Sequence, residues 1–303
     1  MKQDRGSNSL FALAVLLGGA SYGCVSPVVK LAYQRGFSAG EVTTGQFYYA
    51  VVILWMIVLI TIRSGSKCVQ LKRMDIVRIV GLGLLGTGTA VFYYGALHLL
   101  PAWLTTILLF QFSWMTFVID YVVRRKKPTK WQWISIGFIV IGTILANLHM
   151  QATHSFSLIG MIEGLLSGAT YAAFLYINGS LKTPIPPFLR AALITTVSAV
   201  AVSFIYVADA ATVVSAWRGM WIYGSLIGLL SQAIPTSLFA IGIPRIGGSA
   251  AAILSSVELP VAVILAAMIL HEQVGLFAWA GVLLIIVGIG FGQRQQRELK
   301  ASG

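Results

Sequence analysis

The sequence is a succession of apolar runs, each about twenty residues long, separated by short polar connections. Gly248–Leu270 is one such run, in which Glu258 is the one charged residue. At about 1.5 Å per residue, a helix of this length crosses the roughly 30 Å hydrocarbon core of a bilayer. Lipid offers no hydrogen bonds to an open backbone, so chains cross it as helices or as closed barrels. The runs therefore predict an all-α integral membrane protein.

The composition excludes an ordinary soluble domain. The 303 residues are 57% hydrophobic and 10% charged, with a mean hydropathy of +0.85, whereas soluble domains are about 25% charged. A net charge of +12 would suggest nucleic acid if it gathered on one face, but here it lies in the connections between apolar runs. We therefore expect the lipid bilayer as a partner and no nucleic acid. Cys24 and Cys68 predict neither a disulfide framework nor a metal site, and no cofactor is expected.

We predict ten transmembrane helices from a hydropathy window of about 19 residues. They cover residues 10–32, 45–62, 76–97, 102–123, 131–148, 157–178, 188–207, 219–241, 249–270 and 275–292. Lys2 and Arg5 before the first run resemble the start of a signal peptide. That run continues to Ala32, so we predict a retained helix, with cleavage as the alternative.

The basic residues predict the orientation of the chain. With the N-terminus inside, every Lys and Arg falls in a cytoplasmic segment except Lys30, Arg35 and Arg218. Cytoplasmic connections carry an excess of Lys and Arg, and this clean separation requires an even number of spans. We expect a multi-pass protein of the cell inner (plasma) membrane with both termini cytoplasmic.

The two halves of the chain resemble each other. Leu16–Tyr22 matches Leu165–Tyr171, and Ile107–Leu108 matches Ile253–Leu254 with a similar displacement. We therefore predict two five-helix repeats, residues 1–150 and 151–303. Because five is odd, the second repeat enters the membrane inverted. Inverted repeats with a site at their midplane interface are typical of transporters that work by alternating access.

Polar residues near span centres are the candidate binding residues. A carboxylate at the bilayer midplane costs about 2.5–3.5 kcal/mol on insertion scales, so Glu258 is the first candidate, followed by Gln111 and Gln232. The alternative for either glutamine is an interhelical hydrogen bond, worth about 0.6 kcal/mol on average. For Glu258 the alternative is a protonated acid bonded to a neighbouring backbone carbonyl.

Aromatic residues and a second acid complete the set of candidates. Tyr22, Tyr171 and Trp114 lie away from span ends and are expected to wall a cavity, whereas aromatic residues at span ends usually anchor the interface. For Glu163 a cavity-lining role and an interfacial role are equally open.

Prolines interrupt three of the predicted helices. Proline has no N–H to donate, and Pro235 and Pro260 leave the carbonyls of Ser231 and Ser256 without their helical partners. With Pro27 in the first helix, they are predicted hinges for a rocking motion.

Several segments resemble the drug/metabolite transporter superfamily, specifically its ten-helix EamA type. They are Tyr22–Lys30, Ala250–Leu254 followed by Pro260, His271–Glu272, where the family shows Gly-Glu, and Trp279, Gly281 and Gly288. Gln46 stands where the family's second helix commonly has arginine. The resemblance is greatest to bacterial aromatic amino-acid exporters. It implies a transporter of small metabolites without a cofactor.

The functional hypothesis is a secondary transporter of small organic metabolites, most simply an exporter of aromatic or apolar amino acids, acting as a monomer. A multidrug or other metabolite transporter is the alternative, and an intramembrane enzyme, a channel or a receptor are weaker ones. No pair of acids, and no nucleophile with a base, stands at catalytic spacing, so we assign no catalytic residue and no metal ligand.

Overall fold

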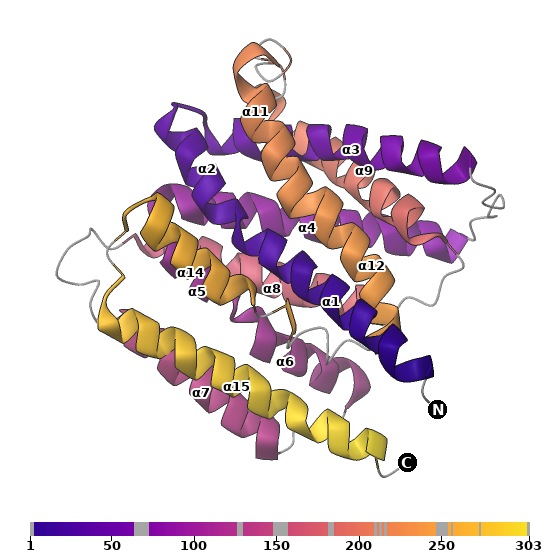
Figure 1. Ribbon diagram of the computed structural model, residues 1–303. Helices are drawn as coiled ribbons and strands as arrows, with labels where there is room; N and C mark the ends of the chain where they lie inside the picture. The colour runs from indigo at the N-terminus through magenta and orange to yellow at the C-terminus, as the bar shows by residue number, and fades with distance from the viewer. Residues whose placement is uncertain are drawn as a thin grey trace.

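The computed structural model describes residues 3–63, 73–125, 130–147, 157–180, 185–208, 211, 214, 217–246, 254–255, 257–272 and 274–301. All of the secondary structure in these ranges is helical (Figure 1). The helices are α1 (Gln3–Gly23), α2 (Val25–Gln34), α3 (Ala39–Arg63), α4 (Arg73–Leu99), α5 (Ala102–Leu109), α6 (Phe112–Arg124), α7 (Lys130–Asn147), α8 (Leu158–Ser180), α9 (Pro187–Ile205), α11 (Trp217–Gly228), the π-helix η2 (Leu229–Ala233), α12 (Ile234–Ile246), α14 (Glu258–Ile269) and α15 (Leu276–Ala301).

Seven helical segments in the described part are long and apolar enough to cross a bilayer. They are Leu10–Gln34, Ala39–Thr61, Arg73–Leu99, Ala102–Val123, Leu158–Asn178, Pro187–Ile205 and Gly219–Ile243. The other three predicted runs contain the shorter apolar helices Trp133–Gly142, Glu258–Ile269 and Leu276–Gly288. The all-α membrane fold is therefore confirmed, and the count of ten spans stays a prediction.

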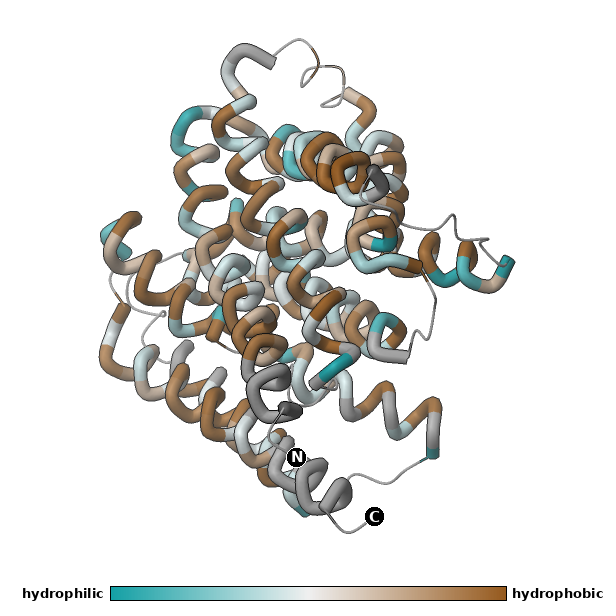
Figure 2. Tube along the Cα trace, turned by 45° about the vertical axis from the view of Figure 1, so that its right-hand side comes forward, coloured by the Kyte–Doolittle hydropathy of each residue, from teal (hydrophilic) through white to brown (hydrophobic). Residues whose placement is uncertain are grey.

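The surface agrees with a lipid environment. Hydrophobic residues recur along the helices in Figure 2, and large side chains such as Phe204, Ile60 and Leu276 are mostly exposed. Exposed apolar surface of this extent is unusual for a soluble monomer. It is the surface that hydrocarbon would cover.

The first and fourth predicted spans are each divided into two helices. The first consists of α1 and α2, and the break is at Cys24, whose N–H bonds the Ser21 carbonyl at 3.2 Å. Pro27 therefore lies in the first turn of α2, where a missing N–H costs nothing. The fourth consists of α5 and α6, which break at Phe110 and Gln111 without a proline.

The predicted eighth span contains a π-helical turn just before Pro235. In this register the Ile234 N–H bonds the Leu229 carbonyl, so the next carbonyl, that of Leu230, faces the proline and has no N–H to accept. Ser21 on α1 donates its hydroxyl to this carbonyl at 2.8 Å. The sequence predicted a freed carbonyl at Ser231. The π register moves it by one residue, and a neighbouring helix satisfies it, as membrane interiors require.

Helices far apart in the sequence pack in pairs. α7 lies along α15 at the lower edge of Figure 1, α4 packs on α8, α1 on α12 and α3 on α9. Small residues permit the closest approaches: a Cβ built on Gly142 of α7 would lie 2.7 Å from the Gly281 carbonyl oxygen of α15. These pairs surround a central space to which both halves contribute.

Candidate functional site

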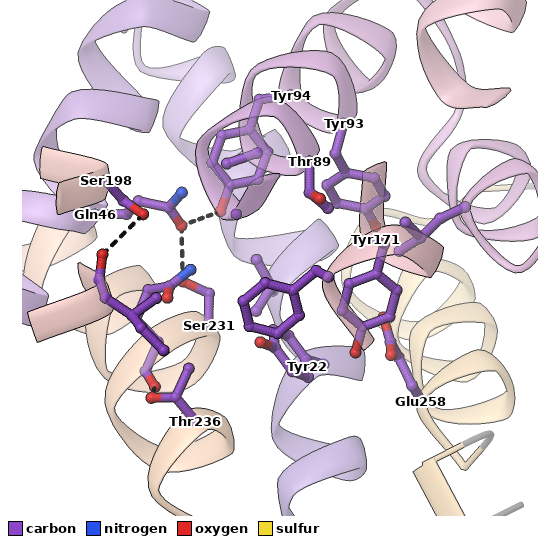
Figure 3. Close-up of a pocket in the computed structure, with 17 residues that line it drawn as sticks. Tyr22, Gln46, Thr89, Tyr93, Tyr94, Tyr171, Ser198, Ser231, Thr236 and Glu258 are labelled. Carbon is purple, nitrogen blue, oxygen red and sulfur yellow. Dashed lines mark hydrogen bonds between the residues drawn. The ribbon is translucent and has the colours of Figure 1, made fainter. Parts of the chain in front are cut away.

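A cavity that is partly open to the outside lies among α1, α2, α3, α4, α5, α8, α9, η2, α12 and α14. The lining is largely aromatic and apolar, with few polar groups (Figure 3). The polar and aromatic side chains that line it are Tyr22, Gln46, Thr89, Tyr93, Tyr94, Tyr171, Phe174, Ser198, Ser231, Gln232, Thr236 and Glu258.

Four of the residues expected from the sequence line this cavity: Tyr22, Tyr171, Gln232 and Glu258. The two tyrosines occupy matching positions in the repeated segments and meet edge to face, with ring centroids 6.4 Å apart. Phe112 packs edge-on against Tyr171 at 4.9 Å. Because each tyrosine comes from a different half, the aromatic wall spans the boundary between the halves.

Glu258 is the first residue of α14 and is 5% exposed. Its carboxylate lies beside the Tyr171 hydroxyl in Figure 3 and is near enough to Tyr22 to interact with it electrostatically. The N-terminal end of a helix carries a partial positive charge that favours an acid there. No Lys, Arg or His appears among the described residues that line the cavity, so the acid has no counter-ion within this space.

The opposite wall carries a hydrogen-bond network that the sequence did not predict. Gln46 of α3 accepts two bonds at Oε1, from the Tyr94 hydroxyl at 2.5 Å and from the Ser231 hydroxyl at 2.7 Å (Figure 3). Gln46 is 1% exposed, and the three side chains come from α3, α4 and η2. The sequence signal available was a lone glutamine in an apolar run, which we noted only as a departure from the family pattern.

Gln111 and Trp114 do not line the cavity. Gln111 is buried at the break between α5 and α6, where its Nε2 donates to the Ile107 carbonyl at 3.1 Å. Its Oε1 accepts from Trp114 Nε1 at 3.0 Å. The structure therefore places these two candidates in a local network at the helix break.

Glu163 is also outside the cavity lining. It lies on α8 against α4, where a Cβ built on Gly95 would be 2.6 Å from its Oε2 atom. This oxygen is buried and has no hydrogen-bond partner among the described residues. The carboxylate of Glu163 fits against α4 because residue 95 is a glycine and has no side chain there.

A second polar cluster joins the two halves at the end of α14. Glu272 accepts from the N–H groups of Ala102 and Trp103, at 3.1 and 3.5 Å, at the start of α5. Lys30 donates to the Leu100 carbonyl at 2.7 Å. His271 has a φ of 52°, in the left-handed region that favours glycine, which accounts for the Gly-Glu pattern of the family at this place.

Among the residues that the structure describes, no group of three His, Cys, Asp or Glu side chains could hold a metal ion. The chemistry of the cavity is therefore that of one carboxylate, several hydroxyls, two carboxamides and aromatic rings.

Comparison with known proteins agrees with this architecture. The model of the EamA-like transporter family matches the chain twice, at residues 9–148 and 158–291. The chain belongs to the EamA-like transporter family. It is thus a multi-pass membrane transporter of small molecules, and the family expected from the sequence is confirmed.

Curated relatives are named as transporters without a substrate. The "Uncharacterized transporter YcbK" of Bacillus subtilis is 26% identical over 292 residues, 91% of each chain. The "Uncharacterized transporter YwfM" of the same organism is 24% identical over 193 residues, and the match spans 61% of this chain and 62% of that relative. A solved structure titled "Crystal structure of protein" superposes with a TM-score of 0.66 at 12% identity, covering 97% of this chain and 99% of that one. At this identity the likeness shows the fold alone, and amino-acid export stays a prediction.

Proposed function

We propose that the chain is a secondary transporter that moves a small organic amine across the plasma membrane by alternating access, acting as a monomer. The substrate pairs its ammonium group with Glu258 and packs its apolar body between Tyr22 and Tyr171. Amino acids with aromatic or apolar side chains, the class expected from the sequence, carry both features, as do amine drugs.

The observation that carries this proposal is the position of Glu258. A carboxylate in the membrane interior is costly unless a cation or a polar group compensates it, and no cationic side chain among the described residues lines the cavity. A bound ammonium would supply the missing charge. Tyrosine faces attract cations by about 0.5–2 kcal/mol, so the tyrosines around Glu258 favour the same kind of ligand.

The packing of the helices supports two inverted repeats of residues 1–150 and 151–303. In the predicted repeats α8 corresponds to α1, α9 to α3, and α4 to the span formed by α11 and α12. Replacing each helix by its counterpart turns the pair α4–α8 into α12–α1 and the pair α4–α9 into α11–α3. All four pairs are in contact. The family model also matches each half separately. Such exchange is expected when two copies of one unit enclose a shared site.

The helix breaks support a rocking motion of these repeats across ten spans. Pro27, Pro235 and Pro260 each lie in the first turn of the helix that follows a break, so they keep the break in place without straining the helix. The start of α1 and the end of α15 lie toward the same side of the molecule in Figure 1. This arrangement supports an even number of spans with both termini cytoplasmic.

The test is flux through the purified full chain in proteoliposomes. We expect Glu258→Gln to lower the kcat/KM for a transported amine about 30-fold or more, because removing one partner of a buried charge pair costs about 2–5 kcal/mol. Glu41→Gln is the matched control. Glu41 accepts the Ser38 N–H at 2.8 Å in a capping box at the start of α3, a role that glutamine also fills.

Measuring the flux at several pH values separates the roles of Glu258. If the ionised acid binds the ammonium, flux in the native protein falls as the pH is lowered and the acid is protonated, and Glu258→Gln removes this acid limb. Equal flux and equal pH dependence in the native and Glu258→Gln proteins would exclude Glu258 from the mechanism and end the proposal.

A further inference from the structure

Gly86 of α4 is the one glycine among the described residues that line the cavity. A Cβ built on it would lie 3.5 Å from Ser198 Oγ on α9 and 4.0 Å from the Phe174 ring on α8. These are ordinary contact distances, so the packing of α4 against its neighbours does not require a glycine here. Because Ser198 and Phe174 also line the cavity, the space that the missing side chain leaves open is part of the cavity.

Another glycine of the same helix has a packing role that Gly86 lacks. A Cβ built on Gly83 would lie 2.5 Å from Val197 Cγ1 of α9, so the close approach of α9 to α4 requires a glycine at this position. At position 86 a methyl group would fit, and alanine would favour the helix more than glycine does. What glycine provides at position 86 is therefore room in the cavity and not a close helix contact.

Aromatic rings connect this space to the surroundings of Glu258. Tyr171 lies beside the acid (Figure 3), and Phe174 stacks on Tyr171 with ring centroids 6.3 Å apart and an interplanar angle of 12°. Glu258 and Ser198 are drawn on opposite sides of the cavity in Figure 3. Since Ser198 contributes the atom nearest to a Cβ at Gly86, the space beside Gly86 is the end of the cavity away from the acid.

The walls at this end are mainly apolar. Ala90 and Ile194, which lie four residues from Gly86 and Ser198 respectively, also line the cavity. The hydroxyl of Ser198 donates to the Gly83 carbonyl at 2.8 Å, so its proton is already bonded within the protein. An apolar group placed there is removed from water without leaving a polar group of the protein unpaired.

We propose that Gly86 is a specificity-determining residue that leaves room for the far end of the substrate. Glu258 binds the ammonium group, and the apolar body extends past Tyr171 and along Phe174 into the space beside Gly86. Short amines fill only the part of the cavity beside Glu258 and bind more weakly. This inference rests on the proposed transport function and narrows its substrate class to amines with an extended apolar body.

A series of amines of increasing length tests the room on the native protein. Phenethylamine, 3-phenylpropylamine and 4-phenylbutylamine share the ring and the ammonium group and differ by one methylene group at each step. Binding is measured by titration calorimetry on the full chain in lipid nanodiscs, with empty nanodiscs as the blank and at a pH where the amines are protonated. We expect the affinity to rise about fourfold with each added methylene group. An affinity that stays constant or falls along the series would overturn the proposal.

Variants that fill the space connect the preference for length to Gly86. We expect Gly86→Val to weaken the binding of 4-phenylbutylamine about 10-fold or more, with phenethylamine unchanged within about threefold. Gly86→Ala should weaken 4-phenylbutylamine about fourfold and should unfold at the same or a higher temperature than the native protein, so it gives the answer if the valine variant does not fold. Gly81→Ala and Gly81→Val are the matched controls. Gly81 is on the same helix, no described atom lies within 4 Å of a Cβ there, and it is not part of the lining, so the preference for length should persist.

The outcomes distinguish this inference from the function on which it rests. Equal weakening of the short and the long amine in the Gly86 variants, or a preference for length that survives both substitutions, would overturn the role of Gly86 and leave amine transport standing. If 4-phenylbutylamine binds but shows no influx into proteoliposomes above that of protein-free liposomes, the proposed function is wrong. If none of the amines binds the native protein, both proposals fail.

Discussion

The two halves of the molecule interrupt a helix at matching places, and the polar residue beside each break has a different environment. In the first half α5 ends at Leu109 and α6 begins at Phe112. In the second half α14 begins at Glu258, after helical residues at 254 and 255. When Ile107–Leu108 is aligned with Ile253–Leu254, Leu109 falls on Ser255 and Phe112 on Glu258. In this alignment the two breaks fall at the same point.

Glycines bring a neighbouring helix against both breaks in the same way. A Cβ built on Gly19 of α1 would lie 2.8 Å from the backbone of Ser255, and one on Gly168 of α8 would lie 2.9 Å from the Leu109 carbonyl. Gly19 and Gly168 are themselves matching positions of the repeated segments. The packing of a neighbouring helix against the backbone is thus the same at the two breaks.

The chemistry at the two breaks differs. Gln111 turns its amide to Ile107 and Trp114 within its own helical segment, whereas Glu258 turns its carboxylate into the cavity beside Tyr171. The two breaks are alike in position, and they differ in that Glu258 lines the cavity and Gln111 does not.

The largest effect is expected at the glycines. Gly19→Ala and Gly168→Ala place a methyl group less than 3 Å from backbone atoms, and overpacking of this kind costs about 1–3 kcal/mol. Both variants should unfold at a lower temperature in detergent, and the folded fraction of Gly19→Ala should also show reduced flux because α1 positions the cavity side of α14.

Gly81→Ala controls for the loss of a glycine from a membrane helix. No described atom lies within 4 Å of a Cβ at this position of α4, so its thermal stability should equal or exceed that of the native protein. Equal stability of all three variants would mean that the breaks are not closely packed, and the comparison of the two halves would lose its structural basis.

A smaller effect is expected at Glu272, which holds the start of α5 from the other half of the chain. An acid that accepts the first N–H groups of a helix contributes about 0.5–2 kcal/mol. We expect Glu272→Ala to lower the thermal stability accordingly and Glu272→Gln, which keeps an acceptor, to lower it less. If the alanine variant is as stable as the native protein, this junction does not couple the halves.

Much of the fold could be predicted because lipid imposes strict rules on a chain. The length of the apolar runs led to the helical membrane fold, and position away from the span ends led to Tyr22 and Tyr171. Position near a span centre did not distinguish Glu258, which lines the cavity, from Gln111, which does not. Which side of a helix faces a cavity depends on how the other helices pack, and a single sequence does not contain that information.

The hydrogen-bond network of the cavity was beyond prediction for a related reason. Serine and threonine in membrane helices commonly bond the carbonyl of their own preceding turn, as Thr106 does with Ala102, so Ser231 carried no signal of its bond to Gln46. The proline at 235 marked an interruption, but its position did not reveal the π register. Gln46 lies at the start of the predicted span 45–62 and Gln111 near the centre of its span, so the sequence favoured Gln111, whereas the structure places Gln46 in the cavity lining.

The smallest effect is expected at the break of the first half, where Gln111 bonds Trp114. A double-mutant cycle of Gln111→Leu and Trp114→Phe, followed by thermal unfolding, should give a coupling energy of about 0.6 kcal/mol, the average for polar contacts between membrane residues. The affinity for a transported amine should stay within about threefold in all three variants, since neither side chain is among the described residues that line the cavity. An affinity loss in Gln111→Leu comparable to that in Glu258→Gln would show that both breaks contact the substrate, and the asymmetry between the halves would then be wrong.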